Sequence, residues 1–135
     1  MEHSLELMRD AKTIAVVGVS SNPTRPSNDI ARYLIDAGYT VYLVNPNEEE
    51  IFGLKVYPSV RDLPEPVDIV DIFRRPGDVP PVVDDAIAAK AKAVWMQLGI
   101  VNEDAAAKAR AAGLDVVMDL CTKVEHRKLL RTQAS

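Results

Sequence analysis

Five short apolar segments constrain the fold of this chain more than any other feature of its sequence. They span residues 14–18, 41–44, 67–73, 93–98 and 114–118, and most are apolar at consecutive positions rather than at alternate ones. A strand with this pattern is covered on both faces, as strands are in a parallel sheet between two layers of helices. The segments therefore predict a mostly parallel β-sheet.

Helical patterns separate the apolar segments. Helices are expected at residues 5–10, 28–37, 79–91, 103–112 and 123–131, and a further short strand at residues 55–57. Asp78 and Asn102 are the expected caps of the third and fourth helices. The alternation predicts an α/β fold, a doubly wound sheet of about five to six strands with helices on both faces. The 135 residues are enough for one domain, expected to span residues 1–135.

Composition excludes several classes of function. With a net charge of −4, the chain lacks the basic surface expected of a nucleic-acid-binding protein. No apolar run reaches the length of a membrane helix. A single cysteine, Cys121, permits neither an internal disulfide nor a cysteine zinc cluster, which favours a cytoplasmic protein. With His3 and His126 as the only histidines, no metal site is expected.

Ligands of an open parallel sheet bind at the carboxyl ends of its strands. The loops at those ends are expected at residues 18–27, 45–47, 73–76 and 97–100. Arg25 precedes a predicted helix whose amino-terminal N–H groups favour an anion, and Arg74 and Arg75 add positive charge at the same edge. These loops suit a nucleotide with several phosphates. The alternative left open is that the arginines are solvated loop charges.

The common nucleotide-binding motifs are missing from these loops. A dinucleotide-binding loop carries three glycines in the pattern G-x-G-x-x-G, and here only Gly18 stands at that turn. Asn45 occupies the position at which an NAD-binding domain has an acid for the ribose hydroxyls. The glycine- and lysine-containing phosphate loop of the P-loop proteins is absent as well.

Several short motifs, taken in order, resemble a known family. They are VGVS at residues 17–20 with RPS at 25–27, VNP at 44–46, VDIVDIFR at 67–74, WMQLG at 95–99 and AGLDVVMD at 112–119. Together they are similar to the stand-alone CoA-binding proteins, relatives of the amino-terminal CoA-binding domain of the succinyl-CoA synthetase α subunit. The resemblance covers about residues 13 to 130. It implies a Rossmann-like fold and a coenzyme A or acyl-CoA ligand held along the strand-end loops.

By position, the resemblance assigns the ligand contacts to residues of these loops. They are Gly18, Ser20, Ser21, Asn22, Arg25, Pro26, Ser27, Asn45, Pro46, Asn47, Phe73, Arg74, Arg75, Gln97, Leu98 and Gly99. The chain departs from the family pattern at Lys90, where many relatives have glycine, and at Leu120, where many have arginine.

No catalytic set is predicted. Cys121 follows the last predicted strand, but on a helix the five-residue offset to His126 points the two side chains in different directions. Cys121 is therefore expected to be structural and His126 to lie on a helix surface. Asp71 is mid-strand, a poor position for a base, and Asp119 has no evident partner.

The main hypothesis from the sequence is a CoA- or acyl-CoA-binding protein without chemistry of its own, a carrier, sensor or module. Its partner is a small nucleotide ligand, with no nucleic acid or membrane; a second copy of the chain or an enzyme is a further partner to consider. The alternatives are an enzyme acting on an acyl-CoA or nucleotide conjugate through Asp119 or Cys121, an NAD(H)-binding sensor, and a pure interaction protein.

Overall fold

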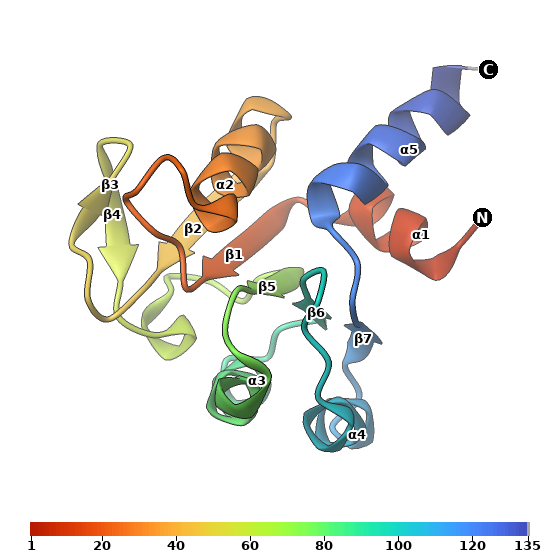
Figure 1. Cartoon of the computed structure of the whole chain (residues 1–135). Helices are drawn as coiled ribbons and strands as arrows, with labels where there is room; N and C mark the ends of the chain where they lie inside the picture. The colour runs from red at the N-terminus through yellow and green to blue at the C-terminus, as the bar shows by residue number, and fades with distance from the viewer. Residues whose placement is uncertain (135) are drawn as a thin grey trace.

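All five apolar segments form strands, and these strands lie in one sheet (Figure 1). The computed structural model, which describes residues 1–134, orders the strands β3-β4-β2-β1-β5-β6-β7. They are β1 (Thr13–Val17), β2 (Thr40–Val44), β3 (Glu50–Ile51), β4 (Leu54–Tyr57), β5 (Ile69–Ile72), β6 (Ala93–Met96) and β7 (Asp115–Val117). Every pairing is parallel except that of β3 with β4, so the mostly parallel α/β sheet is confirmed.

The sheet is slightly larger than the sequence predicts, with seven strands instead of about five to six. The strand that pattern analysis missed is β3, which has two residues and pairs with β4. Phe52 and Gly53 connect the two strands, and both have positive φ values, 57° and 73°. Such a turn suits a two-residue hairpin, but two residues are too few to display any periodicity.

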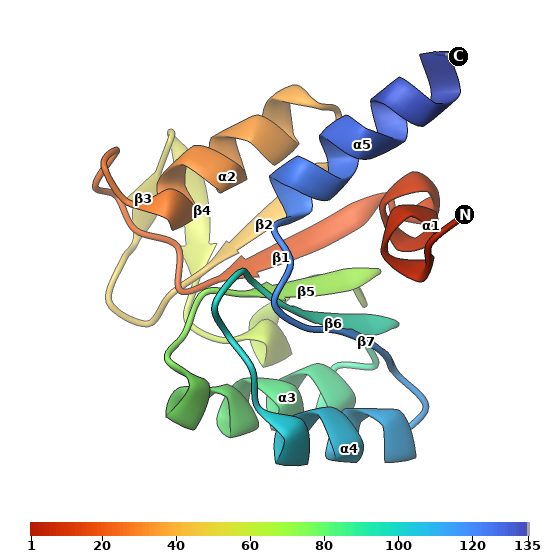
Figure 2. The ribbon, with the colours of Figure 1, turned by 45° about the vertical axis from the view of Figure 1, so that its right-hand side comes forward.

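The helices cover both faces of the sheet. They are α1 (His3–Asp10), α2 (Pro26–Asp36), α3 (Val79–Ala88), α4 (Glu103–Ala111) and α5 (Thr122–Ala134), with 3-10 turns η1 (Val60–Asp62) and η2 (Pro76–Asp78). Figure 2 shows α1, α2 and α5 on one side of the strands and α3 and α4 on the other. The doubly wound arrangement is therefore confirmed.

Each face of the sheet has its own hydrophobic layer. Ile14 and Val16 of β1 point toward α1, α2 and α5, where Trp95 is also buried. Ala15 and Val17 alternate with them and face α3 and α4. Because side chains alternate along a strand, a strand buried on both faces is apolar throughout, as the sequence of β1 is.

The order in which strands are added to the sheet reverses at β1. After β1 the chain forms α2 and then β2 on one side of it, whereas β5 pairs with β1 on the other side. The loops that leave the carboxyl ends of β1 and β5 therefore diverge to opposite faces. This is the position at which an open α/β sheet forms a ligand crevice.

The predicted helix boundaries are correct at Asn102 and wrong at the end of α3. The side chain of Asn102 accepts a hydrogen bond from the Ala105 N–H at 2.9 Å and caps α4. Asp78 precedes α3 but forms no side-chain cap hydrogen bond, and α3 ends at Ala88, three residues before the predicted residue 91. The helix stops there because Lys90 adopts a left-handed backbone conformation, with φ at 61°.

Lys90 stands where many relatives have glycine, and its left-handed backbone conformation makes this difference destabilising. We expect Lys90→Gly to raise the free energy of unfolding by about 0.5–1 kcal/mol, because glycine adopts positive φ without steric strain. Lys90→Ala is the matched control and should give no gain, since alanine keeps the strain and the lysine side chain is exposed. Thermal and urea denaturation measure both; equal stability of the glycine and alanine variants would contradict the explanation.

Candidate functional site

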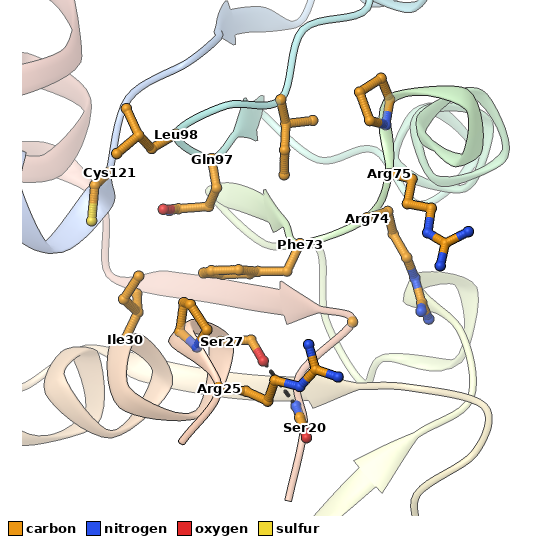
Figure 3. A pocket seen from close by; sticks show the side chains of 14 residues that line it. Ser20, Arg25, Ser27, Ile30, Phe73, Arg74, Arg75, Gln97, Leu98 and Cys121 are labelled. Atoms are coloured by element: carbon orange, nitrogen blue, oxygen red, sulfur yellow. Dashed lines mark hydrogen bonds between the residues drawn. The ribbon is translucent and has the colours of Figure 1, made fainter. Parts of the chain in front are cut away.

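A cleft of about 700 Å³ opens at the carboxyl edge of the sheet, where the strand order reverses. It lies between the loops that follow β1, β5 and β6, the first residues of α2, and Cys121 just before α5 (Figure 3). The residues that line it are Gly18, Ser20, Arg25, Pro26, Ser27, Ile30, Phe73, Arg74, Arg75, Pro76, Gln97, Leu98, Ile100 and Cys121.

The structure brings most of the predicted site residues together on this cleft. Those from the candidate set are Gly18, Ser20, Arg25, Pro26, Ser27, Phe73, Arg74, Arg75, Gln97 and Leu98. Ile30, Pro76, Ile100 and Cys121 also line it but were not in that set. Ile30 was missed because it belongs to the apolar face of a helix. Its place one turn after Pro26 is the signal that could have found it.

The remaining predicted residues do not line the cleft: Ser21, Asn22, Asn45, Pro46, Asn47 and Gly99. Two of them position the loops. The Asn45 side chain donates to the Val19 carbonyl at 2.8 Å and accepts from the Asn47 N–H at 2.9 Å. The Gly99 N–H donates to the Asp119 carboxylate at 2.6 Å.

Pro46 lies in a smaller neighbouring pocket of about 150 Å³, which it shares with Arg74. Val44, Pro58 and Val60 also line this pocket, so its walls are mostly apolar. Since Arg74 also lines the main cleft, the two cavities adjoin at this side chain.

Gly18 permits the close approach on which the cleft depends. Its φ is 87°, and a Cβ atom at this position would lie 2.2 Å from the carbonyl oxygen of Phe73. Real Cβ atoms do not approach a backbone oxygen so closely, so only glycine fits between the two loops. The Gly18 N–H donates to Val44 O at 2.9 Å, which also ties the turn to β2.

The first loop is held by its own small polar side chains. The Ser27 hydroxyl accepts from the Ser20 N–H at 3.0 Å, and the Asn28 side chain donates to the Ser20 carbonyl at 2.8 Å. These bonds fix the loop against the first turn of α2, which begins at Pro26. Arg25, just before that turn, is exposed. The loop thus presents a guanidinium beside a helix amino terminus, an arrangement that favours an anion.

The three arginines lie toward one end of the cleft. Figure 3 shows Arg25, Arg74 and Arg75 gathered there, whereas Leu98 and Cys121 lie at the other end. Ile30 lies on the same side as Leu98 and Cys121. The cleft therefore has a cationic end and an apolar end.

A closed set of hydrogen bonds lies beneath the middle of the cleft. The Gln97 Nε2 group donates to Asp71 Oδ1 at 2.7 Å and to Thr122 Oγ1 at 2.8 Å, and the Thr122 hydroxyl donates to Asp71 Oδ2 at 3.0 Å. All three side chains are buried. Burial raises the pKa of the Asp71 carboxyl to about 7, although the bonds from Gln97 and Thr122 act in the opposite direction.

Cys121 and His126 do not form a nucleophile and base. His126 was expected on a helix surface, and that prediction is wrong. The residue is 9% exposed, it hydrogen bonds the Tyr33 hydroxyl through Nδ1 at 2.7 Å, and burial lowers the pKa of its imidazole. His126 lies five residues after Cys121, and its side chain faces α2, which carries Tyr33. Cys121 is half-buried on the cleft wall.

Leu120 departs from the family pattern without disturbing the fold. Its carbonyl accepts a hydrogen bond from the buried Trp95 indole at 2.8 Å, and its side chain packs against the layer under α1, α2 and α5.

Among residues 1–134, no three His, Cys, Asp or Glu side chains are placed to hold a metal ion. None of the helices in that range is long and apolar enough to cross a membrane.

A family model described as a CoA binding domain matches residues 12–127. The chain belongs to this CoA-binding domain family. The uncharacterized protein YneT of Bacillus subtilis is 40% identical over 121 residues, 90% of each chain. Acetate–CoA ligase (ADP-forming) I of Archaeoglobus fulgidus is 39% identical over 74 residues, which make up 55% of this chain but only 11% of the ligase.

The similar solved structures include a chain of about the same length and a much longer one. A hypothetical protein from Pyrococcus horikoshii OT3 superposes with a TM-score of 0.91 at 42% identity, covering 94% of this chain and 89% of that one. The dinucleotide-forming acetyl-coenzyme A synthetase 1 of Ca. Korarchaeum cryptofilum, in complex with phosphate and ADP, gives 0.69 at 32% identity. That match covers 78% of this chain and 25% of the synthetase.

The buried carboxyl of this CoA-binding domain generates a prediction about pH. Because the folded protein holds the Asp71 proton more tightly than the unfolded chain, ionisation of Asp71 destabilises the fold as the pH rises from about 4 to about 7. At about 1.4 kcal/mol per pKa unit, the full effect is at most about 4 kcal/mol.

The test is Asp71→Asn, which removes the ionisation and keeps a group that can hydrogen bond Gln97. We expect this variant to gain stability relative to the wild type at pH 8 and less, or none, at pH 5. Urea denaturation at the two pH values measures the difference. The same difference at both pH values would show that Asp71 does not titrate in this range.

Proposed function

We propose that this protein binds coenzyme A or an acyl-CoA in the cleft and acts as a carrier, sensor or module without chemistry of its own. The observation that supports it most is the division of the cleft into a cationic end and an apolar end. Coenzyme A carries phosphates on its nucleotide half and an uncharged pantetheine arm on the other. Membership of a CoA-binding domain family points to the same ligand.

The cleft residues divide naturally between the two halves of coenzyme A. Arg25 and the first turn of α2 would hold the pyrophosphate, since a guanidinium and free helix N–H groups both favour it. Arg74 or Arg75 would take another phosphate. Because Arg74 also lines the neighbouring pocket beside Pro46, the adenosine would lie there. The pantetheine arm would run toward Leu98 and Cys121.

The loops favour coenzyme A over NAD(H). An NAD-binding domain holds the ribose hydroxyls with an acid after the second strand. Here Asn45 stands after β2, and its amide is already used on Val19 and Asn47. A small-molecule ligand is favoured over a purely interacting role because a cleft with converging arginines lies at the strand-order reversal.

Of the two candidates for catalysis, Asp119 has another role in the structure, and Cys121 has no hydrogen bond to a base within residues 1–134. Asp119 accepts a hydrogen bond from the Gly99 backbone and so holds the loop after β6. Cys121 has no histidine beside it, since His126 bonds Tyr33. A non-catalytic module fits these positions, and homologous segments occur in much longer ligases. An enzyme or a second copy of the chain would be the protein partner, in the reducing cytoplasm.

Isothermal titration calorimetry tests the ligand. We expect saturable binding of coenzyme A and of acetyl-CoA, and none of NADH. Arg25→Ala and Arg74→Ala should each weaken binding at least about tenfold, as expected for the loss of a charge-assisted hydrogen bond to phosphate. Arg110→Ala, at the far end of α4, is the matched control and should bind like the wild type. No binding of coenzyme A at millimolar concentration would overturn the proposal.

A second experiment separates binding from catalysis. We expect acetyl-CoA to stay intact during prolonged incubation with stoichiometric protein, because no base accompanies Cys121. Chromatography of the nucleotide and a thiol assay both follow the thioester. Turnover that is lost in Cys121→Ala or Asp119→Asn would contradict a purely binding role.

A further inference from the structure

The side-chain oxygen of Gln97, on the wall of the cleft, has no hydrogen-bond partner within residues 1–134. The Gln97 side chain is 3% exposed and lines the cleft. Its two N–H bonds are used on Asp71 and Thr122, and no donor within residues 1–134 hydrogen bonds its Oε1. Although the side chain as a whole is buried, Oε1 is not one of the buried unpaired atoms, so it reaches the solvent of the cleft, where water or a ligand can donate to it. This atom is therefore an open acceptor on an otherwise satisfied amide.

The orientation of the amide is fixed from below. An ionised Asp71 carboxylate can only accept hydrogen bonds, so Gln97 must turn its NH2 group toward it. The Thr122 hydroxyl donates to Asp71 and accepts from Gln97, which closes the set. Rotating the amide would place Oε1 against Asp71 Oδ1, two acceptors in contact. The carboxylate and the hydroxyl thus keep Oε1 on the cleft side.

The place of Gln97 along the cleft matches one part of a CoA molecule. In Figure 3 its side chain lies beside Leu98 and points toward Cys121, so Phe73 lies between it and the arginines. Coenzyme A has phosphates first, then two amide groups in the pantetheine arm, then the thiol. With phosphates on the arginines, an amide N–H is the donor that would come to lie near Gln97.

We propose that Gln97 Oε1 accepts a hydrogen bond from a pantetheine amide N–H, with Asp71 and Thr122 as positioning residues that hold it in this orientation. This inference rests on the proposed binding of coenzyme A. It assigns the recognition of the uncharged arm to one atom, whereas the arginines recognise the charged half. The cleft then selects ligands with an amide at a defined distance from a phosphate.

Protonation of Asp71 would release this arrangement. A protonated carboxyl has an O–H that needs an acceptor, and Gln97 Oε1 can supply one by rotating, which turns the NH2 group toward the ligand. The Asp71 pKa of about 7 places this change near neutral pH.

Within residues 1–134, no titratable side chain hydrogen bonds Asp71, whose partners are Gln97 and Thr122. Val16 of β1 and Trp95 of β6 flank it in register. α2 buries Ile30 and Leu34 on this face. α5 contributes Thr122, while Glu125 is bonded to Ser4 of α1 and His126 to Tyr33. The titratable groups of the cleft wall are Arg74 and Arg75, three and four residues after Asp71, Arg25, and Cys121, which directly precedes Thr122.

Calorimetry with two probes tests the inference on the full chain. Coenzyme A carries the amides, whereas adenosine 3′,5′-bisphosphate carries only nucleotide and phosphates. We expect Gln97→Met, which keeps the length and removes the acceptor, to raise the Kd for coenzyme A about fivefold to tenfold, the worth of one hydrogen bond. The Kd for the bisphosphate should change less than about twofold, which also shows that the variant is folded.

The pH dependence of coenzyme A binding distinguishes the two roles of Asp71, because a purely structural role would leave it unchanged. For the wild type, the Kd for coenzyme A should rise about tenfold from pH 8 to pH 6, relative to that of the bisphosphate, as Asp71 takes up a proton. Asp71→Asn should abolish this relative pH dependence. Unchanged coenzyme A affinity in Gln97→Met, or the same relative pH profile in Asp71→Asn, would overturn the inference alone. Wild-type protein that binds no coenzyme A would overturn the proposed function as well.

Discussion

The contact between the Gly18 turn and the Phe73 carbonyl oxygen is the constraint on which the cleft depends. At this point the loops after β1 and β5 meet before they part to opposite faces of the sheet. A side chain at Gly18 would push them apart. The same contact brings Arg74 to the turn and leaves Arg25 on the opposite wall, so one missing Cβ atom sets the spacing of the cationic groups.

The second layer of the site is polar and buried. Asp71, Gln97 and Thr122 come from β5, the end of β6 and the start of α5, three segments far apart in sequence. Burying a carboxylate there destabilises the fold, because desolvation raises its pKa more than two hydrogen bonds lower it. A structural role alone would be met by apolar residues. The network is better explained as a device that orients the Gln97 amide.

The sequence predicts the sheet, the helices and the edge that bears the cleft, because burial on both faces leaves continuous apolar strands. It does not predict β3, which is too short for a pattern, or the positive φ that ends α3 before Lys90. Within the site, the strand-end rule and the family resemblance pointed to the loops after β1, β5 and β6, and residues of all three loops line the cleft. The Asp71 network was not, because pairing across strands depends on a register that a single sequence does not reveal. The bond from Asn45 to the Val19 carbonyl was not predicted either, because it joins two loops far apart in sequence.

The central claim is that coenzyme A lies across this cleft, with its phosphates on the arginines and its pantetheine arm over Gln97. A crystal structure of the complex with coenzyme A tests it most directly. The account predicts phosphate oxygens within hydrogen-bond distance of Arg25 and of Arg74 or Arg75, and a pantetheine amide nitrogen within that distance of Gln97 Oε1. A ligand bound with its phosphates away from the loops after β1 and β5 would contradict the account.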